Sequence, residues 1–172
     1  MQNNVIQPTS SAIVGESLLE RARQNGPADV SPMKLLKLVY IAHGWSLAYF
    51  DQPLIYNRIE AWKFGPVIPD LYHRIKQFGV GSVPSGVLTG GCPVELSEPQ
   101  KRLLDTVWKA YGGFDGIRLS AMTHQPNTPW DTVWNKNRGS TYRGAQISND
   151  LIRGHYKQMM HERRDPAAPA SA

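Results

Sequence analysis

The stretch SPMKLLKLVYIAHGWSLAYF, residues 31–50, decides the fold of this 172-residue chain. Ser31 is a good N-cap residue, and Pro32 suits the first helical position because a proline there loses no hydrogen bond. The apolar side chains that follow run almost all the way round a helix and leave only Lys34, Lys37 and a narrow polar strip for solvent or for pairing. The stretch therefore predicts a central, largely buried helix.

Five further helices are predicted from apolar residues spaced three or four apart and from start and stop residues. They span residues 12–25, 69–78, 97–111 and 118–124, and a last one begins at Ser148. The third has a capping box, because Ser97 is followed three residues later by Gln100. For the fourth we expect Ser120 to act as the cap. Residues 80–94 are rich in Gly, Ser and Pro and predict a surface loop.

A short extended segment or small hairpin is predicted for residues 54–62, where apolar side chains alternate with polar ones. We expect Gly65-Pro66 to end it, since glycine takes a positive φ at a tight turn and proline fixes the entry to the next helix. The predicted fold class is therefore mainly α: five or six helices in one compact domain, residues 1–164, packed around the central helix with a small β element. Residues 165–172 are expected to form a disordered tail.

The composition excludes several classes of protein. Hydrophobic residues make up 41% of the chain and charged residues 19%, which is enough for a packed core. The apolar stretches fall short of the roughly 20 residues of a membrane-spanning helix, and residues 1–4 lack the basic start of a signal peptide, so we expect a cytoplasmic protein without membrane contact. The single Cys92 excludes an internal disulfide and a multi-cysteine zinc site. The formal net charge of +5 is scattered, which favours a solvated basic surface over a dedicated nucleic-acid site.

Three short strings, taken in order, carry a resemblance to a known family. They are Lys34–Tyr40 (KLLKLVY), Glu60–Val67 (EAWKFGPV), and Thr123-His124 ahead of Pro129-Trp130. Together they resemble the Panacea domain of the SocA-like antitoxins, a family also described as phage-associated protein GepA, over roughly residues 18–134. The signature residues in this chain are Lys37, Tyr40, Glu60, Trp62, Gly65, Pro66, His124 and Trp130. Two positions depart from the family pattern, since Phe64 stands where many relatives have Tyr and Leu36 where a polar residue is common.

The resemblance implies an antitoxin that neutralises a partner toxin by direct contact, and that in some relatives also delivers the toxin to a protease. Phage and prophage genomes are a usual home of the family. We expect the chain to cover its toxin over at least about 1,000 Å², anchored by a few aromatic and Arg residues. The candidate contacts are Lys63, Phe64, Tyr72 and Arg74, because they flank the Gly65-Pro66 turn and are not all needed by the core.

Several signature residues have structural interpretations. We expect Trp62 and Trp130 to pack in the core or against a turn, each with a bonded indole N–H. Lys37, Glu60 and His124 stand among apolar neighbours, and an unpaired buried charge costs several kcal/mol. We therefore predict one polar cluster, in which Glu60 bonds Lys37 or His124 and fixes the extended segment against the central helix.

Catalysis is not predicted. The trio of Lys37, Glu60 and His124 has no nucleophile or metal set beside it, and the chain contains no HExxH, GxSxG or GxxxxGK[ST] motif. The other histidines do not have the spacing of a metal-binding face, so no metal and no cofactor are expected. Two alternatives to the antitoxin remain open. One is a nucleic-acid-binding regulator, although no basic recognition helix stands out, and the other is a phage inhibitor of a host defence enzyme.

Overall fold

The structure, a computed structural model, describes residues 6–26 and 29–164. Its elements in chain order are α1 (Ser11–Gln24), α2 (Pro32–Phe50), β1 (Glu60–Trp62), β2 (Gly65–Val67), α3 (Pro69–Ile75), the 3₁₀ turn η1 (Lys76–Phe78), α4 (Glu98–Tyr111), α5 (Gly116–Thr123), α6 (Pro129–Asp131), the π-helical turn η2 (Thr132–Lys136), the 3₁₀ turn η3 (Gly139–Thr141) and α7 (Asn149–Arg164). The predicted mainly α class with a small β element is confirmed. The predicted tail, residues 165–172, lies outside the described residues.

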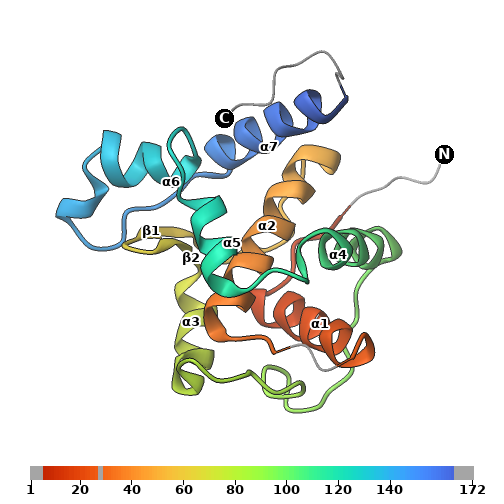
Figure 1. Cartoon of the computed structure of the whole chain (residues 1–172). Coiled ribbons are helices and arrows are strands. Elements are labelled where there is room, and N and C mark those ends of the chain that lie inside the picture. The colour runs from red at the N-terminus through yellow and green to blue at the C-terminus, as the bar shows by residue number, and fades with distance from the viewer. Residues whose placement is uncertain (1–5, 27–28, 165–172) are drawn as a thin grey trace.

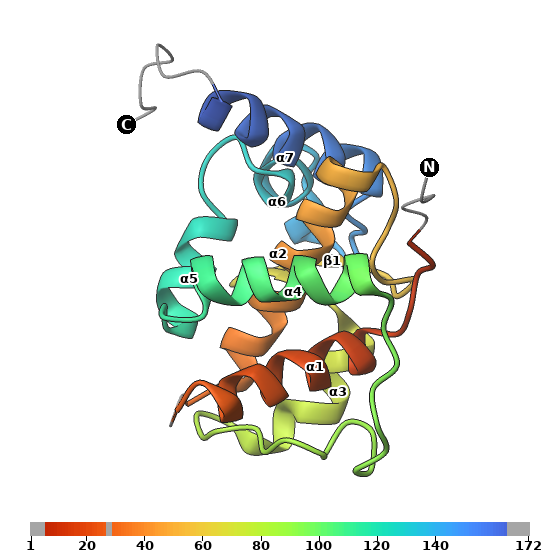
Figure 2. The same ribbon diagram turned by 90° about the vertical axis from the view of Figure 1, so that its right-hand side faces the viewer.

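Helix α2 forms the centre of the fold, as predicted. The Ser31 side chain accepts a hydrogen bond from the Lys34 amide, and Pro32 occupies the first turn. Every residue from Lys34 to Ala48 is buried, so no polar strip of α2 reaches solvent between them. Helices α1 and α4 cross in front of α2 in Figure 2, while α7 lies across its other end.

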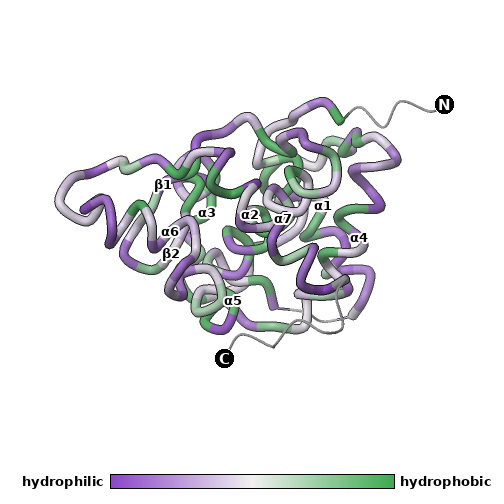
Figure 3. The backbone as a smooth tube through the Cα atoms, turned by 90° about the horizontal axis from the view of Figure 1, so that it is seen from above, coloured by the Kyte–Doolittle hydropathy of each residue, from purple (hydrophilic) through white to green (hydrophobic). Residues whose placement is uncertain are grey.

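The β hairpin and its neighbours lie on one side of the helices. In Figure 1, β1 and β2 stand beside α2 with α3 below them and α6 above them. Seen from above in Figure 3, this group occupies the side opposite α4. The surface formed by the hairpin is thus separated from the α1–α4 side of the molecule.

The hairpin differs from the sequence prediction in its second strand. Strands β1 and β2 pair in antiparallel fashion, with Glu60 opposite Val67 and Trp62 opposite Gly65. Gly65-Pro66 therefore lies inside β2 rather than ending the extended segment. The free edge of β1 is also covered, because the Ala61 N–H donates to the Ala145 carbonyl at 2.8 Å. The segment that precedes α7 thus returns to the hairpin.

Two other predictions need correction. Helix α5 begins after Asp115, whose side chain caps the Arg118 amide, and not at Ser120, which is buried inside the helix. The segment predicted as a surface loop is partly anchored in the core. The buried carboxylate of Glu16 accepts hydrogen bonds from the amides of Gly86 and Leu88. A buried carboxylate needs such donors, and these amides provide them.

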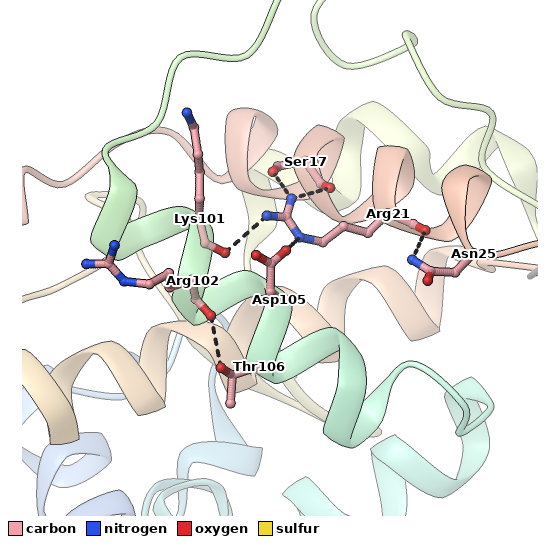
Figure 4. A network of polar contacts seen from close by, with 7 residues as sticks. All are labelled: Ser17, Arg21, Asn25, Lys101, Arg102, Asp105 and Thr106. Atoms are coloured by element: carbon pink, nitrogen blue, oxygen red, sulfur yellow. Dashed lines mark hydrogen bonds and ion pairs between the residues drawn. The ribbon is translucent and has the colours of Figure 1, made fainter.

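A polar network joins α1 to α4 (Figure 4). The Arg21 guanidinium contacts Asp105 Oδ1 at 2.8 Å and donates to the Lys101 carbonyl at 3.1 Å. It also donates to the Ser17 hydroxyl at 2.5 Å on its own helix. The capping box at Ser97, predicted from sequence, fixes the start of α4 beside this network. The network therefore orients two helices that both pack on α2.

His43 shows how α2 holds irregular backbone in place. Its Nε2 bonds Asn149 Oδ1 at 2.8 Å, and its Nδ1 accepts the Ile55 N–H at 3.3 Å. Burial lowers the pKa of the imidazole to about 4. The neutral ring matches both partners, because one nitrogen donates while the other accepts.

Of the helices in the described ranges, none combines the length and the apolar character needed to cross a bilayer.

Helices α2 and α7 pack tightly at Gly44, and this contact leads to the first prediction. A Cβ added at Gly44 would lie 2.3 Å from Cε2 of Tyr156, whose ring also packs against Tyr40 and Trp45. Gly44→Ala is therefore expected to lower the free energy of unfolding by about 1–3 kcal/mol through overpacking. The matched control is Gly154→Ala in α7, where nothing lies within 4 Å, and there we expect a gain of about 0.5–1 kcal/mol. Urea denaturation measures both, and a Gly44→Ala variant as stable as the parent would contradict the packing.

Candidate functional site

All the signature residues except Tyr40 meet where the hairpin packs on α2, α5 and α6. Lys37 Nζ, from α2, donates to the Pro66 carbonyl at 2.8 Å. The Ser120 hydroxyl, from α5, donates to the Phe64 carbonyl at 2.7 Å. The indole N–H of Trp130, from α6, donates to the Trp62 carbonyl at 2.6 Å. Three alternate carbonyls of the hairpin are therefore each held by a side chain of a different helix.

Gly65 makes room for this arrangement. Its φ is +106°, a conformation that side chains rarely adopt, and an added Cβ would lie 2.8 Å from Lys37 Nζ. Both the backbone conformation and the space required by the lysine therefore demand glycine. The expected structural role of Gly65 agrees with this geometry, although its place is in a strand.

The predicted polar cluster is wrong at Glu60. One carboxylate oxygen lies 3.1 Å from Arg58 Nε, and the other accepts the Trp62 indole N–H at 2.9 Å. No ion pair joins Glu60 to Lys37 or His124 in the described part of the chain. The lysine instead bonds a backbone carbonyl, and His124 Nδ1 donates to the Ser120 carbonyl of its own helix. Their charges suggested a carboxylate partner for Lys37 and His124, but both side chains bond main-chain carbonyls.

The two signature tryptophans have bonded indoles, as expected. Trp130 is buried, stacks on Trp134 with ring centroids 5.8 Å apart and packs edge-on against His124. Trp62 is half-buried and packs edge-on against Tyr72 at 5.0 Å. Tyr40, by contrast, faces Tyr156 of α7 rather than the hairpin. It supports the core and not the candidate site.

Lys37 is an unusual residue in this setting. The residue is 2% exposed, and no carboxylate forms an ion pair with it in residues 6–26 and 29–164. Burial lowers the pKa of its amine to about 7. A neutral amine still donates a hydrogen bond, so the bond to Pro66 does not require the charge. This makes Lys37 primarily a structural donor to the hairpin.

The four predicted contact residues lie outside this bonded framework. Lys63 and Phe64 form the exposed hairpin turn, where Phe64 is 60% exposed and the Lys63 ammonium lies 5.4 Å from its ring centroid. Tyr72 is half-buried against Trp62, and Arg74 is exposed on α3. We refer to these four residues as the hairpin face.

A groove of about 800 Å³ lies beside the hairpin face. We call it the aromatic groove, and the lining residues that matter for its chemistry are Trp62, Lys63, His73, Trp134, Tyr142 and Arg143. In the sequence, the irregular turn of residues 125–129 predicts that Trp134 returns to the body of the protein, but no pattern singles out Tyr142 or Arg143. These two follow η3 in an irregular segment, where neither periodicity nor a motif marks them. Within the described residues, no three His, Cys, Asp or Glu side chains gather as a metal cluster.

Comparison with known proteins adds independent information. The family model described as "Antitoxin SocA-like, Panacea domain" matches residues 35–131. The chain is also 26% identical over 159 residues to Antitoxin SocA of Caulobacter vibrioides (strain NA1000 / CB15N), covering 88% of this chain and 84% of that relative. No solved structure gives a significant match. All eight signature residues fall within the matched range, whereas Tyr142 and Arg143 lie beyond it.

The buried lysine leads to a prediction about pH. The unfolded chain keeps the Lys37 proton up to its ordinary pKa of 10.5, whereas the folded chain releases it above about pH 7. The unfolded state therefore binds more protons between these values, and stability rises with pH. Relative to Lys37→Met, the free energy of unfolding of the parent should increase by about 2 kcal/mol from pH 7 to pH 9.

Urea denaturation at a series of pH values measures this difference. The comparison with Lys37→Met removes the contribution of all other titrating groups. Lys109→Met changes an exposed lysine of α4 and is expected to follow the parent protein across the same range. Parallel pH profiles for the parent and Lys37→Met would contradict a buried lysine at this position.

Proposed function

The chain belongs to the SocA-like antitoxin family with a Panacea domain, and from this premise we propose that it neutralises a partner toxin by binding it directly through the hairpin face. The observation that carries the proposal is the set of three carbonyl bonds from Lys37, Ser120 and Trp130. They hold the hairpin backbone rigidly while its turn stays exposed. The relative named an antitoxin supports the same assignment.

The exposed residues suit a protein partner. Phe64 presents an apolar ring to solvent, and aromatic residues contribute strongly to interfaces. Lys63 and Arg74 are exposed and form no ion pair in the described part of the chain, so their charges are available to a partner. Because the backbone beneath them is already fixed, binding loses less conformational entropy. The hairpin face would form the centre of an interface of at least about 1,000 Å².

The proposed action is stoichiometric. The chain covers the active or target-binding surface of the toxin, and no covalent bond is made or broken. Transfer of the toxin to a protease, implied for some relatives, would add a second contact elsewhere on the chain. In that case the toxin level would fall when both proteins are present, whereas occlusion alone leaves it unchanged.

The proposal predicts loss of protection when the hairpin face is altered. The toxin to test is found by expressing the neighbouring reading frames singly. Any small protein among them that arrests growth is then co-expressed with this chain in a growth assay. The triple variant Lys63→Glu, Phe64→Ala, Arg74→Glu should lose rescue and bind the toxin at least about 100-fold more weakly, since hot-spot residues contribute about 1–3 kcal/mol each. Circular dichroism verifies that the variant remains folded.

The matched control reverses charge on the far side of the molecule. Arg102→Glu with Lys109→Glu changes two exposed cations of α4 and should leave rescue intact. Full rescue by the triple variant would refute the hairpin face as the binding surface. A sequence-specific, salt-dependent shift of DNA without any toxin binding would instead favour the nucleic-acid regulator.

A further inference from the structure

We propose that the aromatic groove receives an extended acidic segment of the bound toxin, with an apolar side chain of that segment packed against Trp62 and Trp134. This inference rests on the proposed function and specifies the chemistry of the partner. The groove adjoins the hairpin face through Lys63, which belongs to both. One partner can therefore cover the hairpin turn and place a neighbouring segment in the groove.

The groove is formed by three parts of the chain that meet beside the hairpin. Strand β1 and the turn supply Trp62 and Lys63, α3 supplies His73, and the segment that runs from η2 past η3 supplies Trp134 and Arg143. Figure 1 shows the hairpin between α3 and the segment that follows α6. A volume of about 800 Å³ exceeds that of any single side chain. It suits a short stretch of polypeptide better than one anchoring residue.

The aromatic side chains of the groove are fixed before binding. Trp62 is held by its bond to Glu60 and by the edge-on contact with Tyr72. Trp134 stacks on Trp130, with the ring planes inclined by only 19°. Rigid aromatic surfaces contribute contact area at a low entropic cost. The groove therefore needs little rearrangement to accept an apolar side chain.

The backbone of the outer wall is also constrained. Trp134 stands in η2, a π-helical turn, and such turns are rare and often occur at functional sites. Arg138 adopts a left-handed conformation, with φ of +55°. A Cβ added at Gly139 would lie 2.5 Å from the Val133 carbonyl oxygen, so this turn packs directly against η2. The outer wall of the groove is therefore held in place by packing between the turns η2 and η3.

The charge of the groove favours an acidic partner. Lys63 and Arg143 are exposed and lie in no ion pair among residues 6–26 and 29–164. The lining carboxylate, Glu60, is already paired with Arg58 at 3.1 Å. The free charges that face a ligand are therefore positive. Complementary acidic side chains would raise the association rate and fix the orientation of the partner.

A protein segment fits these observations better than nucleic acid does. Single-stranded nucleic acid binds in grooves where many cations follow the phosphate backbone. Here the lining offers two, Lys63 and Arg143. Both edges of β1 are already paired, so the segment is recognised by its side chains and not by strand addition. A segment with acidic residues beside an apolar side chain would complement both the cations and the aromatic rings of the groove.

The first test selects ligands for the groove in the absence of the toxin. Random peptides of about twelve residues, displayed on phage, are panned on the full chain, and the enriched peptides are then measured by fluorescence anisotropy. We expect acidic peptides with an apolar or aromatic residue. Arg143→Glu reverses a charge of the groove, and Thr141→Trp places a large ring at a residue that also lines it. Each variant should weaken binding at least 10-fold. The control Arg102→Glu on α4 should change it less than twofold.

The site of binding is read from the tryptophan indole signals in ¹H–¹⁵N spectra. Addition of an enriched peptide should shift the signals of Trp62 and Trp134, whereas Trp45 and Trp108, which pack elsewhere, should not move. Absence of enrichment, enrichment of peptides without acidic residues, or equal affinity for Arg143→Glu would overturn the inference. Stronger binding of a thymidine oligonucleotide, weakened by the same variants, would assign the groove to nucleic acid and also refute it.

Growth rescue separates this inference from the proposed function. If the parent protein and both groove variants rescue equally while the hairpin-face variant does not, the groove inference fails and the antitoxin function stands. If acidic peptides bind in the groove but the chain neither binds nor rescues from the toxin, the proposed function fails and so does the toxin as occupant of the groove, while the preference of the groove for acidic segments stands. Loss of rescue in Thr141→Trp, with folding retained, supports both.

Discussion

The geometry of the candidate site depends on three hydrogen bonds to the hairpin carbonyls of Trp62, Phe64 and Pro66. Strands of three residues are too short to stabilise a hairpin in water by themselves. Its position therefore depends on the helices that donate to it and on the segment before α7 that pairs with β1. An unmade bond at these sites would leave a buried polar group without a partner, which costs more than the bond itself contributes. The helical core and the exposed turn are thus parts of one arrangement.

Lys37 has the most demanding position in this arrangement. A lysine in the middle of a buried helix loses its hydration, and here the compensation is a single main-chain carbonyl of β2. The bond is possible only because Gly65 leaves space for the ammonium group. The two residues therefore constrain each other although they lie far apart in the sequence. Lys37, which the sequence placed in a polar cluster with Glu60 and His124, instead joins α2 to the hairpin by a hydrogen bond.

Local signals in the sequence predicted the helices well, and tertiary contacts explain the errors. The N-cap at Ser31 and the capping box at Ser97 depend on residues within one turn, so they can be identified without the fold. The pairing of Glu60 is an exception, because its partners Arg58 and Trp62 stand only two residues away on the same face of the extended segment. The period of two could have indicated both of them. Ser120 resembled a helix cap, but its hydroxyl donates to the Phe64 carbonyl of the hairpin. The groove was missed because no local pattern marks the segment that forms its outer wall.

The division between the bonded framework and the proposed contact surface has a consequence for specificity. The match to the family model ends at residue 131, so it includes the donors that hold the hairpin but not Tyr142 and Arg143. Changes in this outer segment would alter the charge and shape of the aromatic groove without disturbing the three carbonyl bonds. Specificity is a difference between affinities and is changed most easily at residues that the fold does not need. A protein built in this way can keep its scaffold while the partner that fits beside the hairpin changes.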